Sequence, residues 1–139
     1  MPELPEVQSV ANYIKPLLLH QTITTIEPLN NFTKVFNTHS PDKIIELVSG
    51  QRINNVLRRG KYIIIDLDQG FLCIHLRMTG QLQTQLTSQD NKKHFTAKIS
   101  MQNGKELYFK DYRKFGRFYF YESLDVIENK LGCEPLSSS

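Results

Sequence analysis

The chain has 139 residues, of which 40% are hydrophobic and 22% are charged. This composition is typical of one globular domain with its own core, and it excludes an intrinsically disordered chain. The net charge of +3 is only mildly basic, and no apolar run is long enough to cross a membrane. The two cysteines, Cys73 and Cys133, are too few for a disulfide framework or a four-cysteine zinc site. We therefore expect a reduced, intracellular domain without a metal ion, a membrane contact or a secretory signal.

The first predicted element is a helix that begins near Pro5, since proline suits a first helical position. Apolar residues recur along it at spacings of three and four, as one buried helix face requires. They are Val7, Val10, Ala11, Ile14, Leu17 and Leu18. A second helix is predicted in SPDKIIELVSG (40–50), where Ser40 is the N-cap and Gly50 ends the helix.

Most of the remaining chain is predicted to form strands. QTITTIEPL (21–29) is short and β-branched, and residues 52–82 contain two apolar runs around a hairpin signal, DLDQG. In residues 95–110, Asn103 and Gly104 separate two alternating segments, which predicts a type I′ turn. An aromatic strand, GRFYFYE, and a last helix, SLDVIENKLG, follow. Short strands with only three helices indicate a mainly β fold, a sandwich or barrel led by an N-terminal helix.

Basic residues are bunched in three segments, RRGK (58–61), KKH (92–94) and KDYRKFGR (110–117). Any one of them is typical of an ordinary solvated surface. Three such clusters interleaved with tyrosine and phenylalanine favour a polyanionic partner.

The opening MPELPEV places a proline directly after the initiator methionine and a carboxylate after the proline. Removal of Met1 exposes the secondary amine of Pro2, and an N-terminal amine with a pKa of about 7.7–8.0 is partly unprotonated at neutral pH. Such an amine can attack an electrophilic carbon and form a Schiff base, with Glu3 as a general acid or base. On the dipeptide alone, a proline that only starts a turn is the simpler interpretation.

Six segments together resemble the formamidopyrimidine-DNA glycosylases, in order and over essentially the whole chain: MPELPEV, RRGKYI, HLRMTG, KKH, DYRKFG and LGCEPL. The resemblance implies a two-sheet β-sandwich led by an N-terminal helix that carries the catalytic terminus. It also implies a bifunctional glycosylase and AP lyase that excises oxidised purines from damaged double-stranded DNA through a Schiff base and β,δ-elimination. We accordingly expect a monomer in a bacterial-type cytoplasm, associated with the nucleoid through DNA.

The resemblance also implies four catalytic residues. Pro2 is the nucleophile, Glu3 assists base loss and sugar-ring opening, Glu6 has a supporting role, and Lys61 acts near the reacting nucleotide in proton transfer and phosphate contact. The simpler interpretations are that Glu6 favours the helix dipole and that Lys61 is a surface lysine after a glycine turn.

Four further residues are implied to contact DNA. Met78, Arg113 and Phe115 fill the space left when the damaged nucleotide is flipped out, and His94 contacts a backbone phosphate. Phe115 is suited to wedge between bases, Met78 to fill a gap, and Arg113 to donate hydrogen bonds to the orphaned base. Taken singly, Met78 is more typical of a core and Phe115 of a packed turn.

We expect the catalytic domain to comprise residues 1–132, and residues 133–139 to begin an interdomain linker. Members of the family are about twice as long, and their second half supplies a helix–two-turn–helix module and a zinc finger. Zinc is therefore expected only in that part of a full-length parent. The chain is expected to be an excised domain or a natural truncation, with weak or absent excision of its own, because many phosphate contacts are missing.

Two alternatives to an enzyme remain open: a DNA-binding module without turnover, and a protein-interaction domain that makes no use of the basic clusters. The sequence also departs from the family pattern at three places. Cys133 stands where proline is common, Tyr112 stands where proline or a small residue is common, and the second histidine often seen two residues after His94 is missing.

Overall fold

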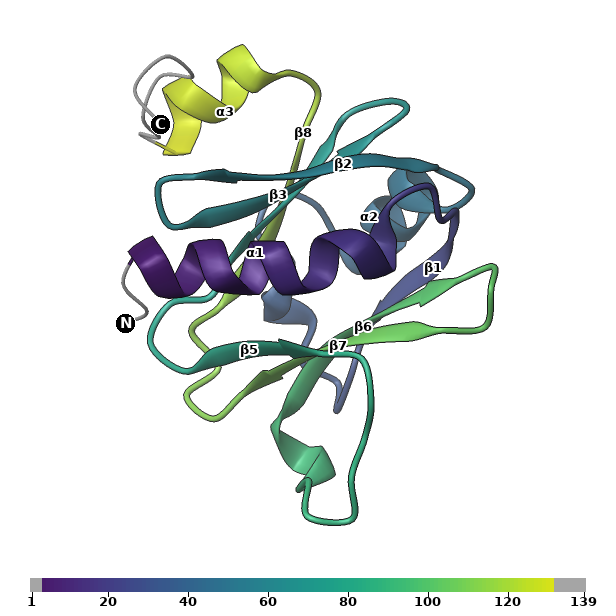
Figure 1. Cartoon of the computed structure of the whole chain (residues 1–139), viewed down its shortest axis with the longest axis vertical. Coiled ribbons are helices and arrows are strands. Elements are labelled where there is room, and N and C mark those ends of the chain that lie inside the picture. The colour runs from purple at the N-terminus through teal and green to yellow at the C-terminus, as the bar shows by residue number, and fades with distance from the viewer. Residues whose placement is uncertain (1–3, 132–139) are drawn as a thin grey trace.

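The computed structural model describes residues 4–131, and it consists of two antiparallel four-stranded sheets with helices around them (Figure 1). The first sheet has the order β1 (Ile23–Pro28), β6 (Phe95–Met101), β7 (Glu106–Asp111), β5 (Gly80–Gln83). The second has the order β2 (Ile53–Arg59), β3 (Tyr62–Leu67), β4 (Phe71–His75), β8 (Arg117–Tyr121). The predicted two-sheet sandwich is thus confirmed.

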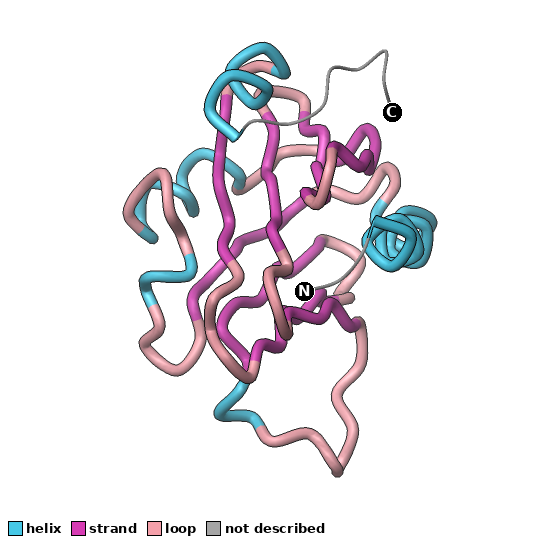
Figure 2. The backbone as a smooth tube through the Cα atoms, turned by 90° about the vertical axis from the view of Figure 1, so that its left-hand side faces the viewer, coloured by secondary structure: helices cyan, strands magenta, loops and turns pink. Residues whose placement is uncertain are grey.

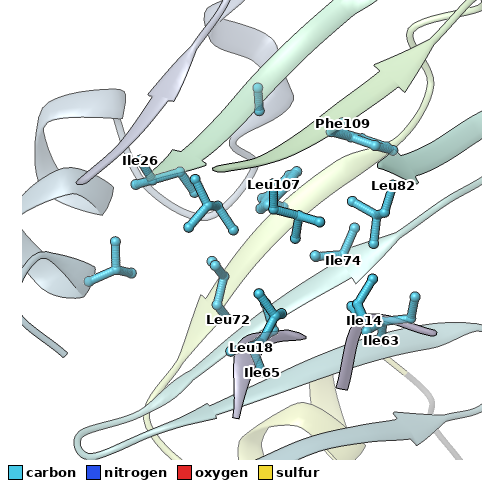
Figure 3. Packing of buried hydrophobic residues seen from close by; sticks show 14 of the residues in the cluster. Ile14, Leu18, Ile26, Ile63, Ile65, Leu72, Ile74, Leu82, Leu107 and Phe109 are labelled. Atoms are coloured by element: carbon cyan, nitrogen blue, oxygen red, sulfur yellow. The ribbon is translucent and has the colours of Figure 1, made fainter. Parts of the chain in front are cut away.

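The core lies between the two sheets and is closed along one side by α1 (Leu4–Leu18). Figure 3 shows Phe109 and Leu107 of the first sheet facing Ile74 and Leu72 of the second, with Ile14 of α1 beside them. The alternation of apolar residues along the strands produces this arrangement, because every second side chain points to the same face of a sheet.

The N-terminal helix α1 is held by both sheets, and in Figure 2 it is seen along its axis at one side of them. The helix begins one residue before the predicted Pro5. Of its predicted apolar stripe, four residues are buried and Val10 and Leu17 are half-buried. Arg58 of β2 donates a hydrogen bond from Nε to Gln8 Oε1 at 2.9 Å. On the other side, the hydroxyls of Tyr13 and Thr84, just after β5, lie 3.2 Å apart. These contacts fix the helix against the edge strands of both sheets.

The two other predicted helices are confirmed as α2 (Pro41–Val48) and α3 (Leu124–Leu131), and short 3-10 turns form η1 (Thr33–Val35) and η2 (Lys92–His94). Ser40 Oγ accepts a hydrogen bond from the backbone N–H of Lys43 at 3.3 Å, as an N-cap should. Ser123 Oγ does the same for Val126 at 3.2 Å. The predicted boundary between residues 1–132 and 133–139 lies outside the described residues.

The predicted type I′ turn at Asn103–Gly104 is wrong. Only Gly104 of the pair has a positive φ, +86°, whereas a type I′ turn requires positive φ at both central residues. The Gly104 N–H donates to the Met101 carbonyl, and the Met101 N–H donates to the Lys105 carbonyl, each at 3.0 Å. These two bonds define a three-residue loop. Asn103 instead uses its side-chain oxygen to accept from the Lys105 N–H at 3.0 Å, an alternative that its sequence neighbours do not reveal.

The segment before the DLDQG hairpin forms two strands, joined by a second hairpin at the glycine turn before Lys61. Gly60, with φ +56°, turns the chain between β2 and β3, which pair along their whole length. Lys61 consequently lies at the tip of a tight hairpin, and its position in the fold is fixed by the glycine before it.

Candidate active site and nucleic-acid interface

Two loops run side by side from one sheet to the other. Loop 76–79 connects β4 to β5, and loop 112–116 connects β7 to β8. The two loops begin and end next to each other, because β4 pairs with β8 and β5 pairs with β7. The paired end residues are His75 with Arg117, and Gly80 with Asp111.

Met78, Arg113 and Phe115 meet on these loops, and we refer to them as the exposed trio. Arg113 Nη1 lies 3.5 Å from Met78 Sδ, and its guanidinium carbon lies 5.8 Å from the centroid of the Phe115 ring. Met78 and Phe115 keep 47% and 50% of their surface exposed, which is unusual for large apolar side chains. The structure therefore brings together the three residues that the motifs HLRMTG and DYRKFG predicted as one group, on an edge that is both apolar and cationic.

Asp111, at the end of β7, ties the two loops together from beneath, and the sequence analysis did not single it out. The residue is 0% exposed. Its carboxylate accepts hydrogen bonds from the Thr79 hydroxyl, from the Arg113 N–H at 3.2 Å and from the Gly116 N–H at 2.7 Å. Its buried position could have been recognised from the sequence, because buried and half-buried residues alternate along β7 and Asp111 falls at a core-facing position.

Glu6 lies in the first turn of α1 and is exposed. It lines an open pocket of about 490 Å³ together with Met78 and with strand β5. The structure thus places Glu6 and one member of the exposed trio around the same pocket. Pro2 and Glu3, the predicted nucleophile and its carboxylate, lie outside the described residues.

Lys61 and His75 are close enough for their charges to interact. The pKa of His75 is lowered to about 4, mainly because the ring is buried, and further by the positive charges of Arg77 and Lys61. His75 Nδ1 accepts a hydrogen bond from the Arg77 N–H at 2.9 Å, so the neutral ring carries its proton on Nε2. The ring also packs edge-on against Tyr62 at 4.5 Å. His75 therefore supports the start of loop 76–79.

The lowered pKa of His75 makes stability depend on pH in a defined window. An unfolded chain binds a proton at this histidine below about pH 6.5, whereas the folded chain does so only near pH 4. Folding is therefore opposed progressively as the pH falls from about 6.5 to about 4. We expect urea midpoints of the wild type to decrease through this range more steeply than those of His75→Gln. Equal slopes for the two proteins would contradict the assigned environment of His75.

His94 lies in η2, on the long segment between β5 and β6 that extends from the sandwich (Figure 1). Its ring is 4.4 Å from the ring of Tyr112, which is 53% exposed. Desolvation lowers the pKa of His94, and the positive charges of Lys93, Lys110 and Lys114 lower it further. Tyr112, noted above only as a departure from the family pattern, therefore links the predicted phosphate contact to the loop of the exposed trio.

The basic clusters differ in how freely their charges face solvent. Lys110 is partly neutralised by Asp90, whose carboxylate lies 3.0 Å from its Nζ. Lys114 and Arg117 instead flank the ring of Phe32, at 5.7 and 5.4 Å from its centroid. Lys114 lies on the same loop as Arg113, whereas Arg117, the first residue of β8, donates from Nη1 to the carbonyls of Lys114 and Gly116 at 2.8 and 2.9 Å. Within residues 4–131, no group of three or more metal-binding side chains is placed to hold an ion, and no helix is long and apolar enough to span a membrane.

Solved structures of DNA-repair proteins share this fold. Lactococcus lactis Fpg bound to DNA that contains an abasic site matches with a TM-score of 0.82 and 27% identity, over 94% of this chain and 48% of that one. MutM in complex with DNA containing carbocyclic 8-oxo-G matches with the same TM-score and 28% identity, over 94% and 48%. The helix, the sandwich and the loop edge are therefore those of the N-terminal domain of a DNA glycosylase.

A sequence model of the "Formamidopyrimidine-DNA glycosylase N-terminal domain" matches residues 1–118, and the chain belongs to this family. Formamidopyrimidine-DNA glycosylase of Protochlamydia amoebophila is 40% identical over 141 residues, which cover 100% of this chain and 50% of that protein. The Herpetosiphon aurantiacus protein of the same name is 37% identical over 139 residues, covering 98% and 50%. The chain thus spans about half the length of these curated relatives.

Proposed function

We propose that this chain supplies the catalytic part of a bifunctional DNA glycosylase and AP lyase that acts on oxidised purines in double-stranded DNA. The observation that carries the proposal is the meeting of the exposed trio at one edge, beside the pocket that Glu6 lines. Solvent-exposed apolar residues next to an arginine suit insertion into DNA better than they suit a free surface. We also propose that the protein acts as a monomer in the cytoplasm, on nucleoid DNA.

The exposed trio is proposed to fill the gap left by a flipped nucleotide. Flipping a nucleotide costs a few kcal/mol, less for a damaged base, and side chains that replace the lost stacking reduce this cost. Phe115 is rigid and flat enough to enter a base step, and Met78 adapts to the remaining space. The Arg113 guanidinium offers several donors to the unpaired base opposite the gap.

The chemical step is proposed to begin at the amine of Pro2, once Met1 has been removed. Its lone pair attacks the anomeric carbon of the damaged nucleotide, and the base departs with the electrons of the glycosidic bond. The amine loses its proton as the sugar ring opens, which leaves an iminium ion that promotes elimination of both phosphates. Glu3 is proposed to shuttle protons in these steps, with Glu6 and Lys61 in support.

Trapping with borohydride tests the proposal directly. We expect the 139-residue chain, incubated with a duplex that bears an abasic site, to form a covalent adduct when the imine is reduced. An abasic duplex removes the need for base excision, which the chain on its own is expected to perform weakly. Absence of an adduct from protein that saturates the duplex, and whose mature N-terminus is verified by mass, would contradict the proposal.

A DNA-binding module without turnover is the second candidate. It is favoured by the fact that the exposed trio and His94 belong to loops of the sandwich, so contacts made by these side chains do not involve the N-terminal amine. This candidate predicts binding that weakens as salt increases, no borohydride adduct, and no requirement for removal of Met1.

A further inference from the structure

We propose that Asp111 is a positioning residue for the exposed trio: one buried carboxylate sets the relative placement of the loops that carry Met78 and Arg113. The inference rests on the proposed function, because it assigns a task to the trio that only DNA binding requires. It concerns a residue that touches neither DNA nor the reacting atoms. Its action passes through Thr79 and through the backbone of loop 112–116.

The hydrogen bonds of Asp111 fall into two groups. Those from the N–H groups of Arg113 and Gly116 lie within its own loop and give that loop its shape. The bond from the Thr79 hydroxyl comes from the other loop, and it links the two. Thr79 Oγ1 also accepts from the Arg113 N–H at 3.0 Å. Since a hydroxyl donates only one proton, Thr79 is oriented as donor to Asp111 and acceptor from Arg113.

The burial of Asp111 makes this arrangement stiff. A carboxylate that is 0% exposed has no water to replace a lost partner, so each donor is held in place. Thr79 directly follows Met78, and Arg113 lies two residues after Asp111. Any shift of one loop against the other would therefore stretch a bond to the buried carboxylate and would separate Met78 from Arg113.

Thr79→Val and Thr79→Ser form a matched pair for the test. Valine keeps the shape of threonine but removes the hydroxyl, whereas serine keeps the hydroxyl. In the free chain, we expect hydrogen exchange of the Arg113 amide to accelerate about tenfold in Thr79→Val and to change little in Thr79→Ser. Asp111→Asn serves as a second variant, since its amide cannot accept at both positions, provided that it folds.

The functional readout is insertion into DNA. The duplex carries a tetrahydrofuran abasic analogue, with 2-aminopurine on the opposite strand next to the unpaired base, so unstacking by the exposed trio raises the fluorescence. At saturating protein, we expect the ratio of inserted to non-inserted complex to fall about tenfold in Thr79→Val. Binding to undamaged duplex and the unfolding midpoint of Thr79→Ser serve as references. If Asp111 had a merely structural role, Thr79→Val would lower the stability and leave insertion unchanged.

The outcomes separate the two proposals. Faster exchange with normal insertion in Thr79→Val would overturn the positioning role and leave Asp111 as a structural carboxylate. A wild-type chain that saturates the duplex without any rise in fluorescence would overturn the proposed insertion itself, and the inference with it. A loss of insertion in Thr79→Val that Thr79→Ser does not share supports both.

Discussion

Replacing Pro2 with glycine should reduce the borohydride-trapped adduct about a hundredfold, the size of loss expected when a reacting group is no longer held in place. A proline amine is carried on a ring with a fixed backbone angle, whereas a terminal glycine is the most flexible residue. A secondary amine also forms an iminium ion that keeps its positive charge at any pH, because it has no proton to lose. The imine of a primary amine is neutral unless it is protonated, so it withdraws electrons less well.

The comparison requires that both proteins have lost Met1, which intact-mass measurement establishes. Binding to undamaged duplex and the urea midpoint, measured for both proteins, separate a loss of chemistry from a loss of binding or of folding. Equal trapping by the two proteins would contradict a requirement for the secondary amine of Pro2. Lys61, at the tip of the β2–β3 hairpin, would then be the next residue to replace.

The fold could be predicted from sequence wherever the signal was local. The helix stripe from Val7 to Leu18, the serine caps of α2 and α3 and the DLDQG hairpin all depend on residues a few positions apart. The two local errors concern turns. At Asn103 a side-chain hydrogen bond to the Lys105 N–H competes with the expected backbone conformation, and the RRGK segment around Gly60 was interpreted as a basic cluster although it forms the turn of the β2–β3 hairpin.

The members of the candidate site were predicted through the family resemblance, but the contacts between them were not. Motif resemblance identified Met78 and Arg113, but their contact depends on the pairing of β4 with β8 and of β5 with β7, which join segments far apart in sequence. For the same reason the sequence analysis overlooked Asp111 and His75. Both are polar residues at buried strand positions, and their roles are defined by donors from another loop or by the turn that follows.

Gly116→Ala should destabilise the protein by about 3 kcal/mol, the upper part of the usual range for an overpacked core. A Cβ at this position would lie 2.2 Å from Phe109 Cζ and 2.9 Å from Asp111 Oδ2. Neither neighbour has room to move, because Phe109 is 1% exposed and Asp111 is 0% exposed. The loop must therefore lift, which weakens the Gly116 hydrogen bond to Asp111 and displaces Phe115. Urea unfolding measures the loss of stability, and 2-aminopurine fluorescence measures the loss of insertion.

Gly104→Ala is the matched control for this prediction. A Cβ there meets nothing within 4 Å, so the only cost is the positive φ of +86°, about 1–2 kcal/mol, and insertion should be unaffected. A double-mutant cycle with Phe109→Leu then identifies the obstacle. If the Phe109 ring causes the strain, Phe109→Leu should cost less in Gly116→Ala than in the wild type, because it makes room for the new methyl group. If the two losses of stability simply add, the Phe109 ring moves aside without strain, and Asp111 alone sets the position of the loop.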